Sequence, residues 1–305
     1  MSSSTITLNQ SCEWAKRFNF GRDFAFGSAL EPALTSANIV MQTVMGPPFA
    51  WRWNRVVTGF FTTQGVQDYT LTNWSQSTAM ASNWILVDNL GSSQQVTTPG
   101  TTNNSTYPTF NQVLGGTTTD GSVTWTNRGN FLSSGLDFYP SDTYTFNWIE
   151  TSSCNDGTRW YEIESKICLG LDSTQSRPKW ISAQIDDGNG HITFRTMPCP
   201  DQAYPTVLTL QQKPTIFTSL NQTWSPIPDE YSHIYQWGFL SLMWMFADDP
   251  RFAFANQKFV THLLSSSEGL TETEINIFLN NWQNITGQPI EKADRLVQGV
   301  QSRGV

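Results

Sequence analysis

Charged side chains are scarce in this sequence of 305 residues, because Asp, Glu, Lys and Arg together make up only 14%. An average soluble domain contains about 25%. The surface must therefore be covered mainly by neutral polar side chains, and Ser, Thr, Asn and Gln are plentiful throughout the chain. A surface this poor in charge indicates either faces that neighbouring subunits cover or an extracellular β surface.

The sequence also lacks an excess of basic residues, since 17 Lys and Arg are outnumbered by 25 Asp and Glu and the net charge is -8. A protein that wraps nucleic acid needs a surplus of Lys and Arg to displace the counterions of the phosphates. The composition therefore argues against a protein that wraps nucleic acid. It is compatible with a channel through which DNA passes, because an acidic wall keeps DNA from adhering.

Cysteine is rare, with four residues in the chain: Cys12, Cys154, Cys168 and Cys199. Their spacings match no zinc site, and four are too few for a disulfide framework, so we predict buried free thiols. No secretory signal begins the sequence, and no stretch approaches the ~18 apolar residues of a membrane span. We therefore expect a protein that is made in a reducing cytoplasm and has no membrane partner.

Motifs of the common enzyme classes are missing as well. The sequence contains no nucleophile elbow G-x-S-x-G, no phosphate-binding P-loop and no dinucleotide-binding G-x-G-x-x-G. The histidines His191, His233 and His262 lie far apart in the sequence and outside any H-E-x-x-H motif, which predicts structural or solvated roles. We predict no catalytic, cofactor-binding or metal-binding residues, no cofactor, and a protein that is not an enzyme.

Acidic residues of the middle region are the remaining candidates for catalytic or metal-binding groups. Glycoside cleavage needs two carboxylates that flank the scissile bond, but no spacing selects a pair among Asp137, Asp142, Glu150, Asp156, Glu162 and Glu164. Segment 186–190, with the sequence DDGNG, has the oxygen density of a calcium loop but no downstream bidentate Glu. We predict the tip of a hairpin there.

Aromatic residues are abundant, with 13 Trp, 8 Tyr and 19 Phe. Exposed Trp rings would suit a sugar-binding surface, and eight lie in or near the middle region: Trp51, Trp53, Trp74, Trp84, Trp125, Trp148, Trp160 and Trp180. Trp125 and Trp148, however, alternate with polar residues beside Val123 and Phe146, which is typical of a buried strand face. We therefore predict mostly buried Trp and keep glycan binding as an alternative.

Both ends of the chain have the periodicity of helices. Between residues 29 and 45 apolar positions recur at intervals of three and four, and Pro47 and Pro48 end the helix. Thr271 and Glu274 form the pattern of a capping box at the start of another helix. The full set of expected helices covers residues 10–17, 29–45, 231–246, 250–267, a segment from 271, and a short segment from 289.

The middle of the chain has the period of two that is typical of strands with one buried face. Residues 144–148 alternate in this way, and so do residues 161–169, where the odd positions are Tyr, Ile, Ser, Ile and Leu. Residues 91–122 are polar without a period, which predicts a long exposed loop. The expected fold is α+β, with a helical bundle formed by residues 1–55 and 227–305 and an antiparallel β-sandwich or barrel, residues 56–226, inserted between them.

Segment 224–240 has a Pro-x-x-Tyr entry into a long helix, and an acidic turn at 248–251 and a further helix follow. This stretch resembles the end of the head-to-tail adaptor, or connector, proteins of tailed bacteriophages. Segments 47–55, 115–129 and 194–204 are similar to parts of that family or of other phage virion proteins. Together the resemblance covers about half of the chain.

The resemblance implies a virion structural protein of the neck, assembled in the host cytoplasm. Such proteins form a homo-oligomeric ring of about twelve copies beneath the portal. The implied partners are the portal protein, a downstream tail or nozzle protein, and genomic DNA that passes through the lumen without sequence-specific binding. The alternatives are another phage tail, neck or capsid decoration protein, and a glycan-binding tail component.

Overall fold

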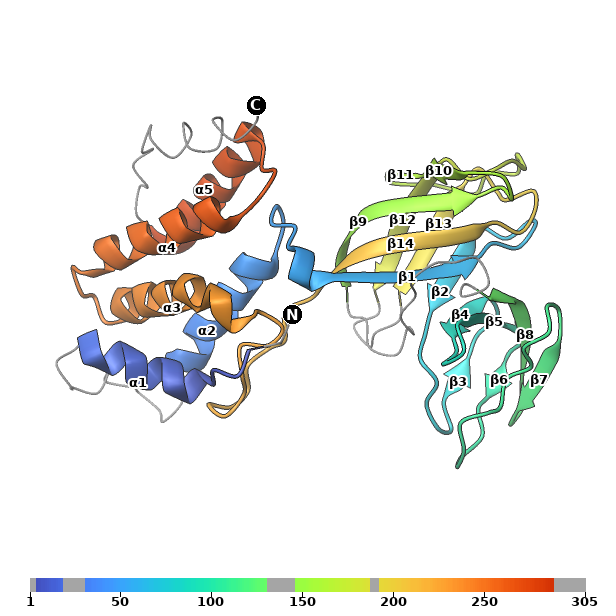
Figure 1. Ribbon diagram of the computed structural model, residues 1–305, viewed down its shortest axis with the longest axis horizontal. Coiled ribbons are helices and arrows are strands. Elements are labelled where there is room, and N and C mark those ends of the chain that lie inside the picture. The colour runs from blue at the N-terminus through green and yellow to red at the C-terminus, as the bar shows by residue number, and fades with distance from the viewer. Residues whose placement is uncertain (1–3, 19–30, 131–145, 187–191, 288–305) are drawn as a thin grey trace. The chain divides into compact units, whose positions relative to one another are not determined.

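The computed structural model describes residues 4–18, 31–130, 146–186 and 192–287, and within them the chain has a mixed α and β fold (Figure 1). Its described part contains five α-helices and two large sheets, of four and eight strands. The chain divides into a helical unit, Met1–Asn54 with Lys213–Val305, and a β unit, Arg55–Gln212. Residues far apart in the sequence therefore build one helical unit.

The second boundary of the β unit lies earlier than the predicted residue 226, because residues 213–226 belong to the helical unit. Phe217 and Trp224 are buried in the helical core. The indole of Trp224 stacks on the ring of Tyr235 with centroids 4.4 Å apart, and its Nε1 donates to Ser11 Oγ at 2.8 Å. This segment has no helical period, so only its burial shows where it belongs.

The helices lie where the sequence predicts them, within a few residues. They are α1 (Leu8–Phe18), α2 (Ala33–Met45), α3 (Ser232–Phe246), α4 (Phe252–Ser266) and α5 (Glu272–Thr286). The predicted capping box begins α5: Thr271 Oγ1 accepts from Glu274 N at 3.3 Å, and Glu274 Oε2 accepts from Thr271 N at 2.8 Å. The helix expected from residue 289 lies outside the described residues.

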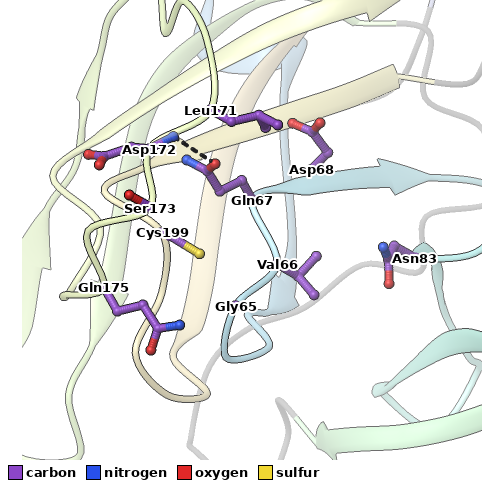
Figure 2. A pocket seen from close by; sticks show the side chains of 10 residues that line it. All are labelled: Gly65, Val66, Gln67, Asp68, Asn83, Leu171, Asp172, Ser173, Gln175 and Cys199. Carbon is purple, nitrogen blue, oxygen red and sulfur yellow. Dashed lines mark hydrogen bonds between the residues drawn. The ribbon is translucent and has the colours of Figure 1, made fainter.

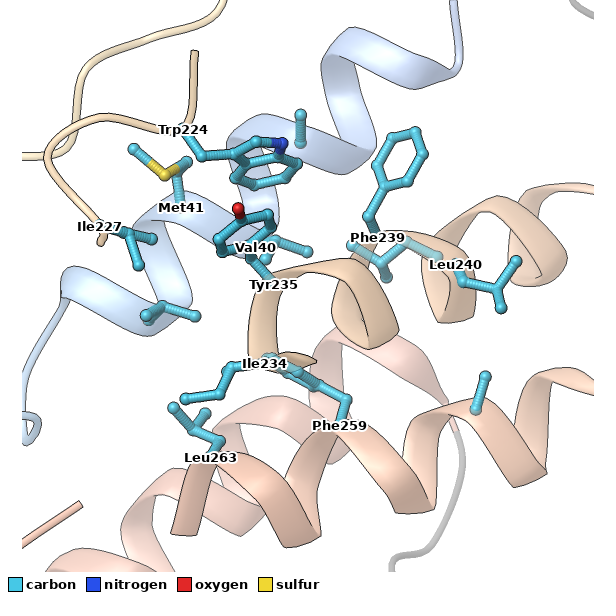
Figure 3. Close-up of a cluster of buried hydrophobic side chains, with 14 of the residues drawn as sticks. Val40, Met41, Trp224, Ile227, Ile234, Tyr235, Phe239, Leu240, Phe259 and Leu263 are labelled. Carbon is cyan, nitrogen blue, oxygen red and sulfur yellow. The ribbon is translucent and has the colours of Figure 1, made fainter. Parts of the chain in front are cut away.

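Helix α3 is apolar on nearly every side, which predicts burial on every side, and residues 238–244 are all buried. Its neighbours come from both ends of the chain, with Val40 on α2 and Phe259 on α4 in the same cluster (Figure 3). Gly238 permits a close approach, because a Cβ there would lie 2.8 Å from the Phe259 ring. Packing on α3 thus joins α2 to the C-terminal helices.

The four-stranded sheet is antiparallel in the order β1-β14-β9-β10. Its strands are β1 (Arg55–Phe61), β14 (Pro205–Gln212), β9 (Phe146–Asn155) and β10 (Trp160–Glu162). The first and last strands of the unit are neighbours, and Arg55 is opposite Gln211. The chain therefore enters and leaves the β unit along one pair of strands.

The eight-stranded sheet is mixed, so the prediction of a purely antiparallel β region is wrong. Its order is β11 (Glu164–Ser165), β12 (Trp180–Asp186), β13 (Ile192–Met197), β2 (Asp68–Leu71), β4 (Trp84–Val87), β5 (Ser92–Thr98), β8 (Val123–Asn130) and β7 (Thr117–Asp120). The pairs β2–β4 and β11–β12 are parallel. In each pair the connection returns the chain to the end of the sheet at which the first strand began. Two short strands, β3 (Ala79–Met80) and β6 (Gly100–Thr101), pair separately.

Side chains from both sheets meet in one core cluster. Phe60 of β1 stacks on Tyr69 of β2 with ring centroids 4.6 Å apart, and Leu208 and Phe194 belong to the same cluster. A second cluster surrounds Trp125, which is fully buried. The alternating pattern around Val123 and Trp125 thus correctly predicted a buried face.

Two further predictions for the β unit are wrong. Residues 91–122 contain β5, β6 and β7, and the polar residues 92–95 of β5 are buried in the middle of the sheet. The alternation over residues 161–169 is broken, since Ile167 and Leu169 are 77% and 79% exposed while Cys168 is buried. The chain passes there from β10 in one sheet to β11 in the other, so the buried side changes.

Candidate functional site

A pocket of about 430 Å³ lies in the β unit between the segment that leads into β2 and the loop before β12 (Figure 2). Six of its ten lining residues carry an amide, carboxyl or hydroxyl group, but apolar atoms, including those of Val66 and Leu171, form most of the exposed lining. The full lining is Gly65, Val66, Gln67, Asp68, Asn83, Leu171, Asp172, Ser173, Gln175 and Cys199. No prediction from the sequence had singled out this group.

Gln67 holds the two sides of the pocket together. Its side chain is buried, with Oε1 accepting from Asp172 N at 3.0 Å and Nε2 donating to Thr196 O at 3.2 Å. Gly65 precedes it with a φ of 77°, a conformation that favours glycine. The turn and the glutamine together position the lining residues.

The charges at the pocket are largely matched. Arg195 donates to both carboxylate oxygens of Asp68, at 2.7 and 2.8 Å, and to Gly170 O at 3.1 Å. Burial, together with the charge of Asp172, raises the pKa of the Cys199 thiol, so the thiol stays protonated and is a poor nucleophile. The remaining amide and carboxylate groups suit hydrogen bonds to a neutral ligand that carries hydroxyl groups.

The structure brings two histidines together that the sequence had left apart. His233 lies in the first turn of α3, His262 lies on α4, and their ring centroids are 5.2 Å apart. Burial and the neighbouring His233 lower the pKa of His262. In the described part of the chain no group of three or more His, Cys, Asp or Glu could hold a metal ion. His191 lies outside the described residues.

The candidate carboxylates do not converge. Glu150 binds Arg55 and Gln211 in the four-stranded sheet. Asp156 accepts from Thr158 N at 2.9 Å in the β9–β10 turn, and hydrogen bonds to Thr158 and Arg159 hold its pKa well below the usual range. The others are Glu162 and Glu164, which are exposed, and Asp137 and Asp142, which lie outside the described residues.

The prediction of mostly buried tryptophans is confirmed only in part. Trp51 and Trp125 are buried, whereas Trp53, Trp74, Trp84, Trp148 and Trp180 are half-buried. Of the eight candidates only Trp160 is exposed, at 39%. The rings of Trp51 and Trp125 are therefore not accessible to a sugar.

The four cysteines are free and buried, which confirms that prediction. The calcium-like segment 186–190 lies outside the described residues except for Asp186 at the end of β12. The described helices include none that is both long and apolar enough to cross a membrane.

Comparison with known proteins assigns the chain to no family. A scan against protein-family models finds no match, and no curated protein matches the sequence.

Proposed function

We propose that this chain is a structural protein of a phage virion, the head-to-tail adaptor whose copies form a ring of about twelve beneath the portal. The observation that carries the proposal is the layout of the chain. Helices from both ends share one core, and the β unit is inserted between them along the paired strands β1 and β14. This layout agrees with the motif order on which the resemblance to adaptors rests.

The finer architecture is part of the same proposal. We interpret the helical unit as a bundle, because α1 to α5 all contribute to one cluster. We interpret the β unit as a sandwich, because the two large sheets enclose a common core. The bundle would form the wall of the ring.

Exposed apolar side chains support burial by neighbouring copies. Phe254 on α4 is 57% exposed, and Ile277 on α5 is 53% exposed. In the β unit Ile167, Leu169 and Leu171 are all exposed within five residues. A group of exposed apolar side chains such as Ile167, Leu169 and Leu171 is typical of an interaction surface, and a ring would cover such surfaces on both sides of each copy.

The proposed partners are the portal protein above and a tail or nozzle protein below. Genomic DNA would pass through the lumen without sequence-specific contacts, and the net charge of -8 would limit adhesion. The role is mechanical, and we infer no enzymatic activity.

Quantitative mass spectrometry of purified virions tests the proposal. A copy number close to that of the portal protein is expected for a neck ring. Tens to hundreds of copies would instead indicate a capsid or tail-tube protein. Absence of the chain from virions would refute any structural role.

The pocket favours a second candidate function, that of a glycan-binding tail component. It combines a largely apolar surface with several amide and carboxylate groups that could bind the hydroxyl groups of a sugar, although the sole exposed candidate ring is that of Trp160. On a glycan array, this function predicts binding that Asp172→Asn abolishes and that Glu162→Gln, on an exposed strand, leaves unchanged. No binding to any glycan would exclude it.

A further inference from the structure

Two arginines in the β unit contact one tyrosine ring. The guanidinium carbon of Arg177 lies 3.4 Å from the ring centroid of Tyr161, and that of Arg159 lies 4.7 Å away. Arg159 Nε also donates to the Tyr161 hydroxyl at 2.6 Å. Arg159 and Tyr161 are two residues apart at strand β10, so they project to the same side, whereas Arg177 comes from the segment before β12.

Arg177 differs from the four arginines of the described chain that pair with a carboxylate. Arg52, Arg55, Arg195 and Arg251 each form an ion pair with a carboxylate. In the described structure Arg177 has neither an ion pair nor a hydrogen bond, and its Nε is shielded from solvent without an acceptor. A guanidinium carries five N–H donors in a fixed fork. Because Nε is shielded, the donors that an anion could reach are those of the two terminal NH₂ groups.

Asp156 acts on Arg159 through its charge, but the Oδ1 atom of Asp156 already accepts from Thr158 N, Thr158 Oγ1 and Arg159 N in the turn. The guanidinium of Arg177 lies over the Tyr161 ring. This contact restricts the arginine side chain before a ligand binds, which reduces the flexibility lost on binding.

We propose that Arg159, Tyr161 and Arg177 form a binding site for a phosphate group. A guanidinium binds phosphate through two parallel N–H···O bonds, and such charge-assisted bonds are the stronger class. The phosphate could be a free ion or the phosphodiester of DNA, which share this chemistry. The inference does not depend on the adaptor proposal, because it concerns one side-chain cluster within the β unit.

NMR of the arginine Nε–H groups in the full chain tests the site directly. Inorganic phosphate is titrated at constant ionic strength against sodium chloride, and a DNA duplex of about 20 base pairs forms the second arm. The expected result is a saturable shift of the Arg177 Nε–H resonance. Arg177→Gln should weaken binding about tenfold or more, with Arg177→Lys intermediate because it keeps the charge and loses the fork.

Arg52→Gln is the matched control, since Arg52 is exposed and already paired with Glu268. It should bind phosphate as the unaltered chain does. Saturation by inorganic phosphate alone would assign the site to a free anion, and saturation by the duplex alone would assign it to DNA. The proposal would be overturned if neither phosphate nor the duplex shifted the Arg177 Nε–H resonance of the unaltered chain more than chloride does. That result would decide the question whatever the variants show.

Discussion

Replacing Asp88 with alanine will remove an acceptor that connects strand β5 to its neighbouring segments. Asp88 is buried at the end of β4. Its Oδ1 accepts from Leu90 N and Ser92 N, both at 2.9 Å, and its Oδ2 accepts from Gln94 Nε2 at 2.9 Å and Gln112 Nε2 at 2.8 Å. One carboxylate therefore accepts four hydrogen bonds.

The expected loss of stability depends on which hydrogen-bond acceptors the four donors keep after the substitution. Gln94 Nε2 and Gln112 Nε2 keep weaker acceptors, Asn111 O at 3.4 Å and Phe110 O at 3.2 Å. The amide of Ser92 is buried, and a buried donor without an acceptor costs about 1–3 kcal/mol. Adding the weakened bonds, we expect Asp88→Ala to lower the free energy of unfolding by about 3 kcal/mol.

Asp88→Asn is the sharper variant because it keeps the shape of the side chain. Its oxygen can still accept from the two amides, but its NH₂ group would face the donors of Gln94 and Gln112, so we expect a loss of about 1–2 kcal/mol. Urea unfolding measures both variants, and hydrogen exchange of residues 88–98 shows where the loss lies. Glu162→Gln, on an exposed strand, is the control.

A loss below about 0.5 kcal/mol for Asp88→Ala, with exchange in β5 unchanged, would refute this reasoning. It would mean that water or a local rearrangement satisfies the four donors as well as the carboxylate does.

Four further predictions concern the helical unit. Gly238→Ala should destabilise it by about 1–3 kcal/mol, because the added Cβ would meet the Phe259 ring at 2.8 Å, as thermal unfolding would show. Thr271→Ala should cost about 1 kcal/mol through loss of the capping box, measured in the same way. Burial raises the pKa of Cys12 to about 11, so a thiol reagent at about pH 8 should label it only after unfolding. The pKa of His262 is lowered in the folded state, so the unfolded state binds more protons as the pH falls through ~6.5. The free energy of unfolding should therefore decrease below that pH, and His262→Gln should reduce this dependence on pH.

Each of these predictions has an outcome that contradicts it. Gly238→Ser should be at least as destabilising as Gly238→Ala, and a neutral result for both would show that the contact relaxes freely. Thr271→Ser should retain the cap and serve as the control for Thr271→Ala. Labelling of native Cys12 at the rate of a free thiol, or an unchanged pH profile for His262→Gln, would contradict the burial of these two side chains.

Local signals in the sequence determined the helices of this protein. The intervals of three and four apolar residues, the capping box at Thr271 and the prolines after residue 46 act within one or two helical turns, so they are readable without a partner. The strand alternation around Trp125 is local in the same sense. These signals predicted the order of helices, strands and helices, and the structure has that order.

Tertiary structure decided the rest, because the partners lie far away in the sequence. The polar residues 92–95 lie in an interior strand of a sheet, and their hydrogen-bonding partners include Gln112 and Arg128 from distant segments. Composition alone assigns such a segment to a loop. Tertiary packing likewise placed residues 213–226 in the helical unit through Trp224, which stacks on Tyr235.

The candidate sites depend on tertiary structure for the same physical reason. The pocket joins residues 65–68 to residues 171–175 through Gln67, and Arg177 reaches Tyr161 across 16 positions of the sequence. Neither arrangement has a spacing that a period or a motif could reveal. The sequence by itself determined which segments are helices and most of the buried strand faces, whereas only the packing of distant segments decided which polar and charged side chains meet.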